Sequence, residues 1–137
     1  MPKALIHTRI RILDEERSLA FYRAFGFEER GRARVGGDTA TVIFLGLPGD
    51  GARLELTLND GRNEPYTQGE GYGHIALTTE GSMDDELARL AANGIQPERE
   101  PYAAYPGGPR ICFVRDPDDY RIELLERNPE DAFARVT

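Results

Sequence analysis

The chain has 137 residues and a formal net charge of −7, with 39% hydrophobic and 30% charged residues. This length suits one ordinary domain or two small modules that share a core, and the composition is that of a folded globular protein. The acidic balance argues against nucleic acid or an anionic membrane as the main partner, because both attract basic surfaces.

The chain has one cysteine, Cys112, which cannot form a disulfide within the chain. A lone cysteine is typical of a reducing compartment, so we expect a cytoplasmic protein. The N-terminus does not resemble a signal peptide, and no apolar run is long enough to span a membrane. We therefore expect no membrane partner.

The first half of the chain has the pattern of one strand, one helix and three further strands. Residues 4–12 alternate between polar and apolar side chains, so His7 should face away from the isoleucines. Asp14 is a suitable N-cap for the helix, whose buried stripe should contain Leu19, Tyr22 and Phe25, and Gly26 follows its end. The five expected elements are a strand at 4–12, a helix at 15–25, and strands at 27–33, 39–45 and 53–58.

The same order repeats in the second half. Ser82 can cap a helix that ends at Asn93 and Gly94, with Met83, Leu87, Leu90 and Ala91 on one apolar face. Strands are expected at 73–79 before this helix and near 95–99, 110–114 and 120–125 after it. The sequence therefore predicts an α+β fold of two tandem βαβββ modules. Its expected parts are a first module at 1–58, a polar linker at 59–71, a second module at 72–127 and a C-terminal tail at 128–137.

Two histidines and two glutamates occupy equivalent places in the two halves. His7 and His74, the two histidines of the chain, fall in the first expected strand of each half, 67 residues apart. Glu55 and Glu123 fall in the last expected strand of each half, 68 residues apart. A single histidine or glutamate in a strand is usually a hydrogen-bonded or solvent-facing residue. The repeat of both in register instead favours one shared role.

The shared role that suits these four side chains is metal binding. Two neutral imidazoles and two carboxylates balance a divalent cation such as Zn, Ni, Co or Mn and leave positions for water or substrate. Within 53–59 the leucines alternate with polar residues, so Glu55 faces away from the apolar layer. An isolated carboxylate on an inner sheet face would be costly without a cation beside it.

Five segments resemble the short, bacterial-type glyoxalase I (lactoylglutathione lyase) of the vicinal oxygen chelate superfamily, over nearly the whole chain. They are HTRIRI at 7–12, SLAFYRAFGF at 18–27, RLELTLN at 53–59, GYGHIAL at 71–77 and FVRDPDDYRIELLER at 113–127. Several superfamily members share the last of these, whereas Glu55 together with GYGHIAL is more particular to glyoxalase I.

This resemblance implies a homodimer with an octahedral metal site across the interface. His7 and Glu55 would come from one chain, and His74 and Glu123 from the other. The implied reaction converts the hemithioacetal of methylglyoxal and glutathione into S-lactoylglutathione. A base moves a proton between neighbouring carbons while a divalent metal stabilises the negative charge. The resemblance makes Glu123 the base and Glu55 its near-symmetric counterpart.

Three further residues are candidates for binding the thiol. Arg11 and Asn59 lie four residues beyond His7 and Glu55, about 13 Å along a strand, which suits the arms of a tripeptide. The family uses an arginine and an asparagine at these places for the γ-glutamyl part of glutathione. A surface salt bridge for Arg11 and a turn for Asn59 are equally good alternatives. Arg110 is a candidate for the glycyl carboxylate.

The resemblance also bears on the metal. Short members of the family work best with Ni²⁺ or Co²⁺ and poorly with Zn²⁺, while longer forms favour Zn²⁺. This chain begins six residues before His7 and has a compact 59–71 segment. We therefore expect Ni²⁺ or Co²⁺, with Zn²⁺ as the alternative.

The chain departs from the family pattern in three places. Asp119 replaces the glycine of the usual DPDGY turn, and aspartate tolerates the left-handed conformation that this turn needs. The FYRAFGF junction is about one residue shorter than usual, which should shift a loop without touching the ligands. The segment 99–110 lacks a lysine often found there, which leaves the contacts to the thiol carboxylates open.

Other functions of the same superfamily are the alternatives. Its dioxygenases and fosfomycin-modifying thiol transferases use two histidines and one glutamate, so Glu55 counts against them. Methylmalonyl-CoA epimerase is closer in mechanism but typically carries glutamine at this place. Non-enzymatic drug-binding proteins of the same fold keep no metal ligands, and the four residues here argue against that class.

Overall fold

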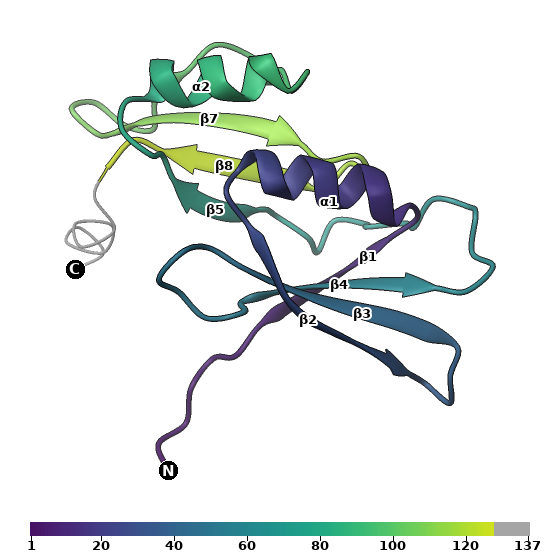
Figure 1. Cartoon of the computed structure of the whole chain (residues 1–137). Helices are drawn as coiled ribbons and strands as arrows, with labels where there is room; N and C mark the ends of the chain where they lie inside the picture. Colours follow the sequence, from purple (N-terminus) through teal and green to yellow (C-terminus); the bar gives the residue numbers. More distant parts are fainter. Residues whose placement is uncertain (128–137) are drawn as a thin grey trace. The chain divides into compact units, whose positions relative to one another are not determined.

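The structure is a computed structural model that describes residues 1–127, and the predicted tail at 128–137 lies outside the described residues. The chain divides into two compact units, Met1–Thr67 and Gln68–Thr137. The more detailed module limits at 58 and 72 stay a prediction. Figure 1 labels both helices and every strand except the short β6 (Tyr102–Ala103).

The first unit contains one helix and one four-stranded sheet. Its elements are β1 (Thr8–Ile12), α1 (Glu15–Ala24), β2 (Glu28–Val35), β3 (Ala40–Gly46) and β4 (Leu54–Asn59). The strands lie in the order β1-β4-β3-β2. The β1–β4 pair is parallel, while the β4–β3 and β3–β2 pairs are antiparallel. The first and last strands of the unit therefore lie side by side.

The second unit repeats this arrangement. Its elements are β5 (Ile75–Thr78), α2 (Met83–Ala92), β6 (Tyr102–Ala103), β7 (Arg110–Arg115) and β8 (Arg121–Leu125). The strand order β5-β8-β7-β6 is the order of the first sheet, again with one parallel pair, β5–β8. The predicted α+β fold of two βαβββ modules is confirmed.

Local sequence signals explain where the helices begin and how one tight turn is made. The Asp14 carboxylate accepts a hydrogen bond from the Arg17 N–H at 3.0 Å, and the Ser82 hydroxyl accepts one from the Asp85 N–H at 3.1 Å. Both caps satisfy backbone donors that a helix leaves free at its start. Asp119 has a φ of 72°, so it adopts the left-handed conformation predicted for this turn.

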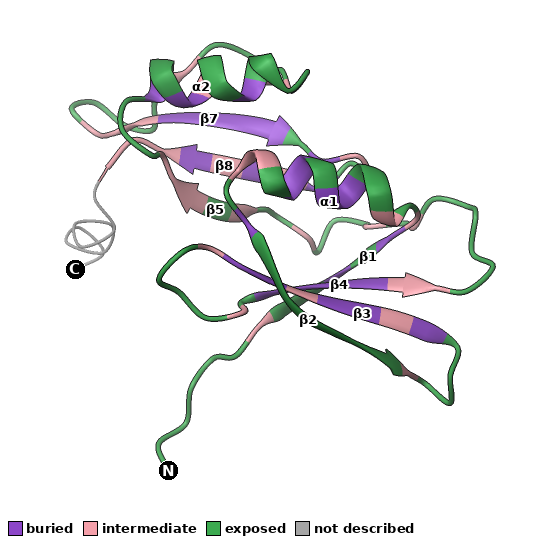
Figure 2. Ribbon diagram, viewed as in Figure 1, coloured by how far each residue is buried: buried purple, intermediate pink, exposed green. Residues whose placement is uncertain are grey.

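Alternating side chains form the core of each sheet. In β1, Ile10 and Ile12 are buried, as are Leu54 and Leu56 in β4. Figure 2 shows that β3 and β7 are mostly buried, whereas β2 is exposed along most of its length. The apolar layer predicted from the alternation is therefore present, and polar residues between these positions face the other way.

Two predicted strands differ from the structure. The strand expected near 95–99 is wrong, because the structure has a two-residue strand at Tyr102–Ala103 instead. Pro97 and Pro101 lack the N–H that a sheet requires, so pairing here is limited. The first strand begins at Thr8 rather than residue 4. Its parallel partner β4 begins opposite Thr8, so earlier residues have no neighbouring strand.

The buried faces of the helices also differ in detail from the predicted stripes. In α1 the buried aromatic side chains are Phe21 and Tyr22, while Phe25, predicted to be buried, is only half-buried. In α2, Glu86 is buried and Ala91, predicted to share the apolar face, is exposed. The stem of a long polar side chain can cover apolar surface, which a count of apolar residues does not anticipate.

Candidate metal centre

His7 and Glu55 lie together in the first unit. His7 immediately precedes β1, and Glu55 is the second residue of β4, the strand parallel to β1. The His7 Nε2 atom lies 3.2 Å from Glu55 Oε1. The parallel pairing of the first and last strands therefore joins two residues that are 48 positions apart in the sequence.

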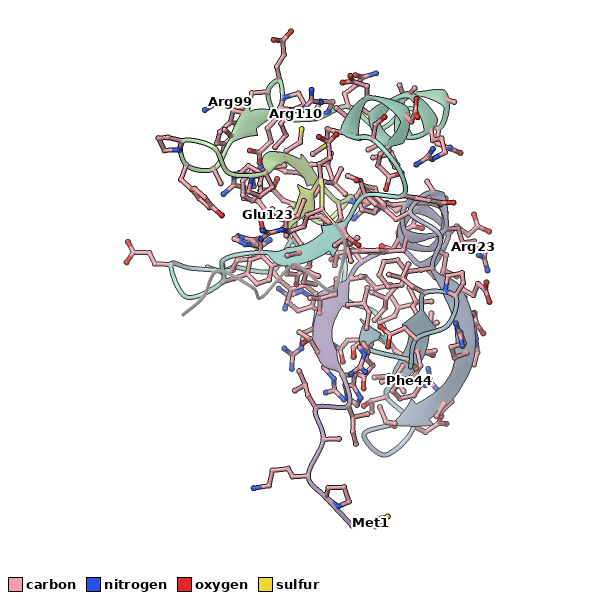
Figure 3. The ribbon with its side chains drawn as sticks, turned by 90° about the vertical axis from the view of Figure 1, so that its left-hand side faces the viewer. Met1, Arg23, Phe44, Arg99, Arg110 and Glu123 are labelled. Carbon is pink, nitrogen blue, oxygen red and sulfur yellow. The ribbon has the colours of Figure 1, made fainter. Side chains whose placement is uncertain are left out.

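His74 and Glu123 form the equivalent pair in the second unit. His74 immediately precedes β5, and Glu123 lies in the middle of β8, beside Ala76 of β5. The His74 Nε2 atom lies 3.6 Å from Glu123 Oε1. Figure 3 labels Glu123 on its strand. The predicted equivalence of the two histidines and the two glutamates is thus reproduced in the strand pairing.

A phenylalanine packs against each histidine. Phe44 of β3 lies opposite Glu55, and its ring contacts the His7 ring edge to face with a centroid distance of 5.5 Å. Phe113 of β7 lies opposite Glu123 and contacts the His74 ring in the same way at 5.3 Å. These contacts hold each imidazole, just before its strand begins, beside the carboxylate.

The donor atoms of both pairs fit a divalent metal ion. Two atoms that bind one ion at about 2.1 Å and at a right angle lie about 3 Å apart, close to the observed 3.2 and 3.6 Å. The Nδ1 atom of His7 is buried and has no hydrogen-bond partner among the described residues. Native structures rarely leave a buried polar atom unpaired in this way.

Within each unit the structure brings one predicted histidine ligand beside one predicted glutamate ligand. Within residues 1–127 no group of three or more His, Cys, Asp or Glu side chains is arranged to hold a metal. Each pair lies inside one unit, so each unit contains half of the predicted four-ligand set.

Glu55 has two further partners. The guanidinium of Arg9 donates a hydrogen bond to Oε2, and the Thr57 hydroxyl donates to the same oxygen at 2.7 Å. Burial, which leaves 3% of the side chain exposed, would raise the pKa of Glu55. The hydrogen bonds from Arg9 and Thr57 and the charges of Arg9 and His7 outweigh it and hold this pKa below its usual range.

Arg9 is the site residue that sequence reasoning missed. The alternation in 4–12 places it on the same face as His7. Its partner becomes apparent only from the register of the parallel pair, in which Arg9 lies directly opposite Glu55. The one sequence signal for Arg9 is its place two residues after His7, a candidate metal ligand.

The predicted thiol-binding residues lie in different surroundings. Asn59 ends β4, and its amide donates to the Tyr66 hydroxyl at 2.9 Å. Arg11 is exposed on β1, opposite Thr57. Their roles stay predictions.

Arg110, the candidate for the glycyl carboxylate, starts β7 (Figure 3) and is already paired with acidic groups. Its Nη2 donates to Asp84 at 2.9 Å, and its Nε lies 3.8 Å from Glu126. A substrate carboxylate would have to compete with both groups. The role of Arg110 also stays a prediction.

Comparison with known proteins gives consistent results. The family model of the Glyoxalase/Bleomycin resistance protein/Dioxygenase superfamily matches residues 4–124. The chain is 36% identical over 125 residues to the lactoylglutathione lyase of Salmonella typhimurium, covering 89% of this chain and 91% of the relative.

Solved structures agree with these matches. The trypanothione-dependent glyoxalase I of Leishmania major has a TM-score of 0.81 at 32% identity, covering 98% of this chain and 94% of that one. Glyoxalase I from Zea mays has a TM-score of 0.79 at 29% identity over 90% of this chain, which spans 44% of the maize chain. The chain described here belongs to the glyoxalase I (lactoylglutathione lyase) family, in its short bacterial form, as its own sequence, its repeated fold and these relatives show.

Proposed function

We propose that the protein is a metal-dependent lactoylglutathione lyase that converts the hemithioacetal of methylglyoxal and glutathione into S-lactoylglutathione. The observation that carries this proposal is the pair of facing imidazole and carboxylate groups, repeated at equivalent places in two units of a glyoxalase I chain. Curated relatives with the name lactoylglutathione lyase align over most of the chain.

The complete site contains His7 and Glu55 of one chain and His74 and Glu123 of a second chain in a homodimer. Each unit presents two donors, whereas catalytic metal ions take three or four protein ligands. In a dimer with two-fold symmetry, pairing unlike halves across the interface produces two identical complete sites. This arrangement uses every donor of both chains.

The four ligands bind the metal, and one carboxylate moves the proton. A bound divalent ion supplies Lewis-acid stabilisation of the negative charge that develops on the substrate oxygens. Glu123 accepts the proton from one carbon of the hemithioacetal and returns it to the neighbouring carbon. Arg11 and Asn59 bind the γ-glutamyl part of the thiol, and Arg110 binds the glycyl carboxylate.

The favoured metal is Ni²⁺ or Co²⁺, with Zn²⁺ less active. All the donors are nitrogen and oxygen atoms, which suit these ions equally well as ligand types. Activity then depends on whether six-coordinate geometry is maintained, and Zn²⁺ readily drops to four or five ligands. A cytoplasmic location stays a prediction. No helix among the described residues is both long and apolar enough to cross a bilayer.

Substitution of single ligands tests the assignment of roles. Glu123→Gln should leave metal binding largely intact and reduce turnover by several orders of magnitude, because an amide oxygen can ligate but cannot take up the proton. His74→Ala should instead lose metal affinity, measured by metal content after dialysis. Near-normal turnover of Glu123→Gln would move the base to Glu55 or exclude this mechanism.

A further inference from the structure

The two half-sites differ in what surrounds the glutamate. On Glu55 the two carboxylate oxygens have separate partners. Oε2 accepts hydrogen bonds from Arg9 and Thr57, while Oε1 lies 3.2 Å from His7 Nε2. The oxygen that faces the histidine is therefore distinct from the oxygen that the neighbouring side chains hold.

The strand register identifies the residues at the same places in the second unit. Arg9 lies opposite Glu55 in the first parallel pair, and Ala76 lies opposite Glu123 in the second. Thr57 follows Glu55 by two residues, and Leu125 follows Glu123 by two. Neither an alanine nor a leucine side chain can donate a hydrogen bond, so neither restraint recurs at these two positions of the second unit.

The cation nearest to Glu123 along its strand is engaged elsewhere. Arg121 precedes Glu123 by two residues, and its Nε and Nη2 atoms both donate to the Glu98 carboxylate at 3.0 Å. Its guanidinium also stacks on the Phe113 ring at 3.9 Å. Among the described residues, His74 is the ion-pair partner of Glu123.

We propose that Arg9 and Thr57 are positioning residues that fix Glu55 through Oε2, which makes Glu55 a static ligand through Oε1 and leaves Glu123 as the glutamate free to turn. The assignment of proton transfer to the freely turning Glu123 rests on the proposed function. The restraint on Glu55 is a property of the folded first unit. Two glutamates of the same chemistry, Glu55 and Glu123, can in this way serve as a static metal ligand and as the base.

The physical basis is the cost of a buried carboxylate. Only 3% of the Glu55 side chain is exposed, compared with 15% for Glu123. A buried charge needs paired donors, and an arginine hydrogen bond to a carboxylate is among the stronger ones. With both donors on Oε2, rotation of the Glu55 carboxylate would break two hydrogen bonds at once. Around Glu123, the described residues at the two equivalent positions, Ala76 and Leu125, offer no side-chain donor that would oppose this rotation.

Metal binding by the whole protein with substitutions in its first unit tests the restraint on Glu55 without a measurement of activity. Arg9→Met and Thr57→Val each remove one donor with little change in volume, and Arg23→Met on the exposed face of α1 is the matched control. Cobalt(II) is the probe, because calorimetry gives its affinity and its visible absorption spectrum reports its ligand geometry. All variants are compared with the intact apoprotein.

We expect Arg9→Met to bind Co²⁺ about 10- to 100-fold more weakly, as is usual when a partner of a ligand is removed. Its cobalt spectrum should change, Thr57→Val should show a smaller change in the same direction, and Arg9→Lys should recover part of the loss. Should Arg9→Met fail to fold, Thr57→Val still decides the question, because it removes only a hydroxyl. Wild-type affinity and spectrum in Thr57→Val and in any folded Arg9→Met would overturn the proposal.

Transfer of the restraint to the second unit tests the freedom of Glu123. The double variant Ala76→Arg/Leu125→Thr places both donors around Glu123, and Ala76→Met/Leu125→Val is its control without donors. Ala76 is exposed, so it has room for a longer side chain. We expect the double variant to keep Co²⁺ affinity and KM and to lose at least about tenfold in kcat.

The cobalt measurements and the transferred variant distinguish failure of the positioning proposal from failure of the proposed function. An unchanged kcat in the transferred variant would contradict the role given to the freedom of Glu123. Absence of isomerase activity in the wild-type protein would instead refute the proposed function, while the cobalt measurements on Arg9 and Thr57 would still decide whether Glu55 is restrained.

Discussion

At the scale of single residues, Glu98 links two arginines of the second sheet. Its carboxylate accepts two hydrogen bonds from Arg121 and lies 2.8 Å from Arg115 Nε. The hydrogen bond from Arg121 is the largest influence on the pKa of Glu98. Partial burial opposes it, and the charges of both arginines reinforce it, so this pKa lies below its ordinary value of 4.5.

The lowered pKa predicts a pH-dependent contribution to stability. Because the folded-state pKa of Glu98 lies below the unfolded value, its contribution is complete above about pH 4.5 and is lost as the pH falls through the folded-state pKa. Glu98→Gln should therefore lower the free energy of unfolding by roughly 1 kcal/mol at about pH 7 and by less at about pH 3. Urea unfolding measures this, with exposed Glu100→Gln as the control. A difference that is the same at both pH values would contradict the prediction.

The residues of the candidate site were predictable to different degrees. The four ligands could be found because His and Glu repeat at one spacing in both halves, a pattern that is local to the sequence. The roles of Arg9 and Thr57 depend on which strand lies beside β1. That neighbour comes from a parallel pairing across 46 residues, which no local pattern encodes.

At the scale of the elements, helix caps and alternating strands were predicted well because their signals lie within a few residues. The errors arose where pairing decides the structure. Residues 4–7 alternate like a strand but have no strand paired beside them, and the stretch 95–99 is interrupted by proline. Periodicity indicates a preference for extended structure, and a sheet also requires a partner with free hydrogen-bonding groups.

The turn between β7 and β8 provides a test at this scale. Asp119 has a φ of 72°, a conformation that L-residues with a Cβ atom adopt at a cost. Asp119→Ala should be less stable than Asp119→Gly by about 1 kcal/mol, because alanine keeps the steric cost and has no polar group to offset it. Thermal unfolding of the two variants measures the difference, and equal stabilities would show that this turn relaxes.

At the scale of the whole molecule, the proposed dimer predicts complementation between inactive chains. One chain carries His7→Ala/Glu55→Ala, and the other carries His74→Ala/Glu123→Ala. Each alone should be inactive. In a mixed dimer one of the two sites receives all four intact ligands, so random mixing should restore about a quarter of the sites. Co-expression with two affinity tags isolates the mixed dimer, and no recovery of metal or activity in it would refute a shared site.

The metal preference is a further property of the whole molecule. We expect the highest activity with Ni²⁺ or Co²⁺ and weak activity with Zn²⁺, because the same ligands maintain six-coordinate geometry more readily around the first two ions. Apoprotein loaded with each metal to equal occupancy, checked by elemental analysis, provides the comparison. Clear superiority of Zn²⁺ would contradict this preference.

The isomerase reaction itself tests the proposed function most directly. Apoprotein loaded with Ni²⁺ is added to methylglyoxal and glutathione, and the ultraviolet absorbance of the thioester product is followed. We predict rapid formation of S-lactoylglutathione that disappears when the metal is removed and returns when it is restored. No product with any divalent metal, with either glutathione or trypanothione as the thiol, would contradict the account.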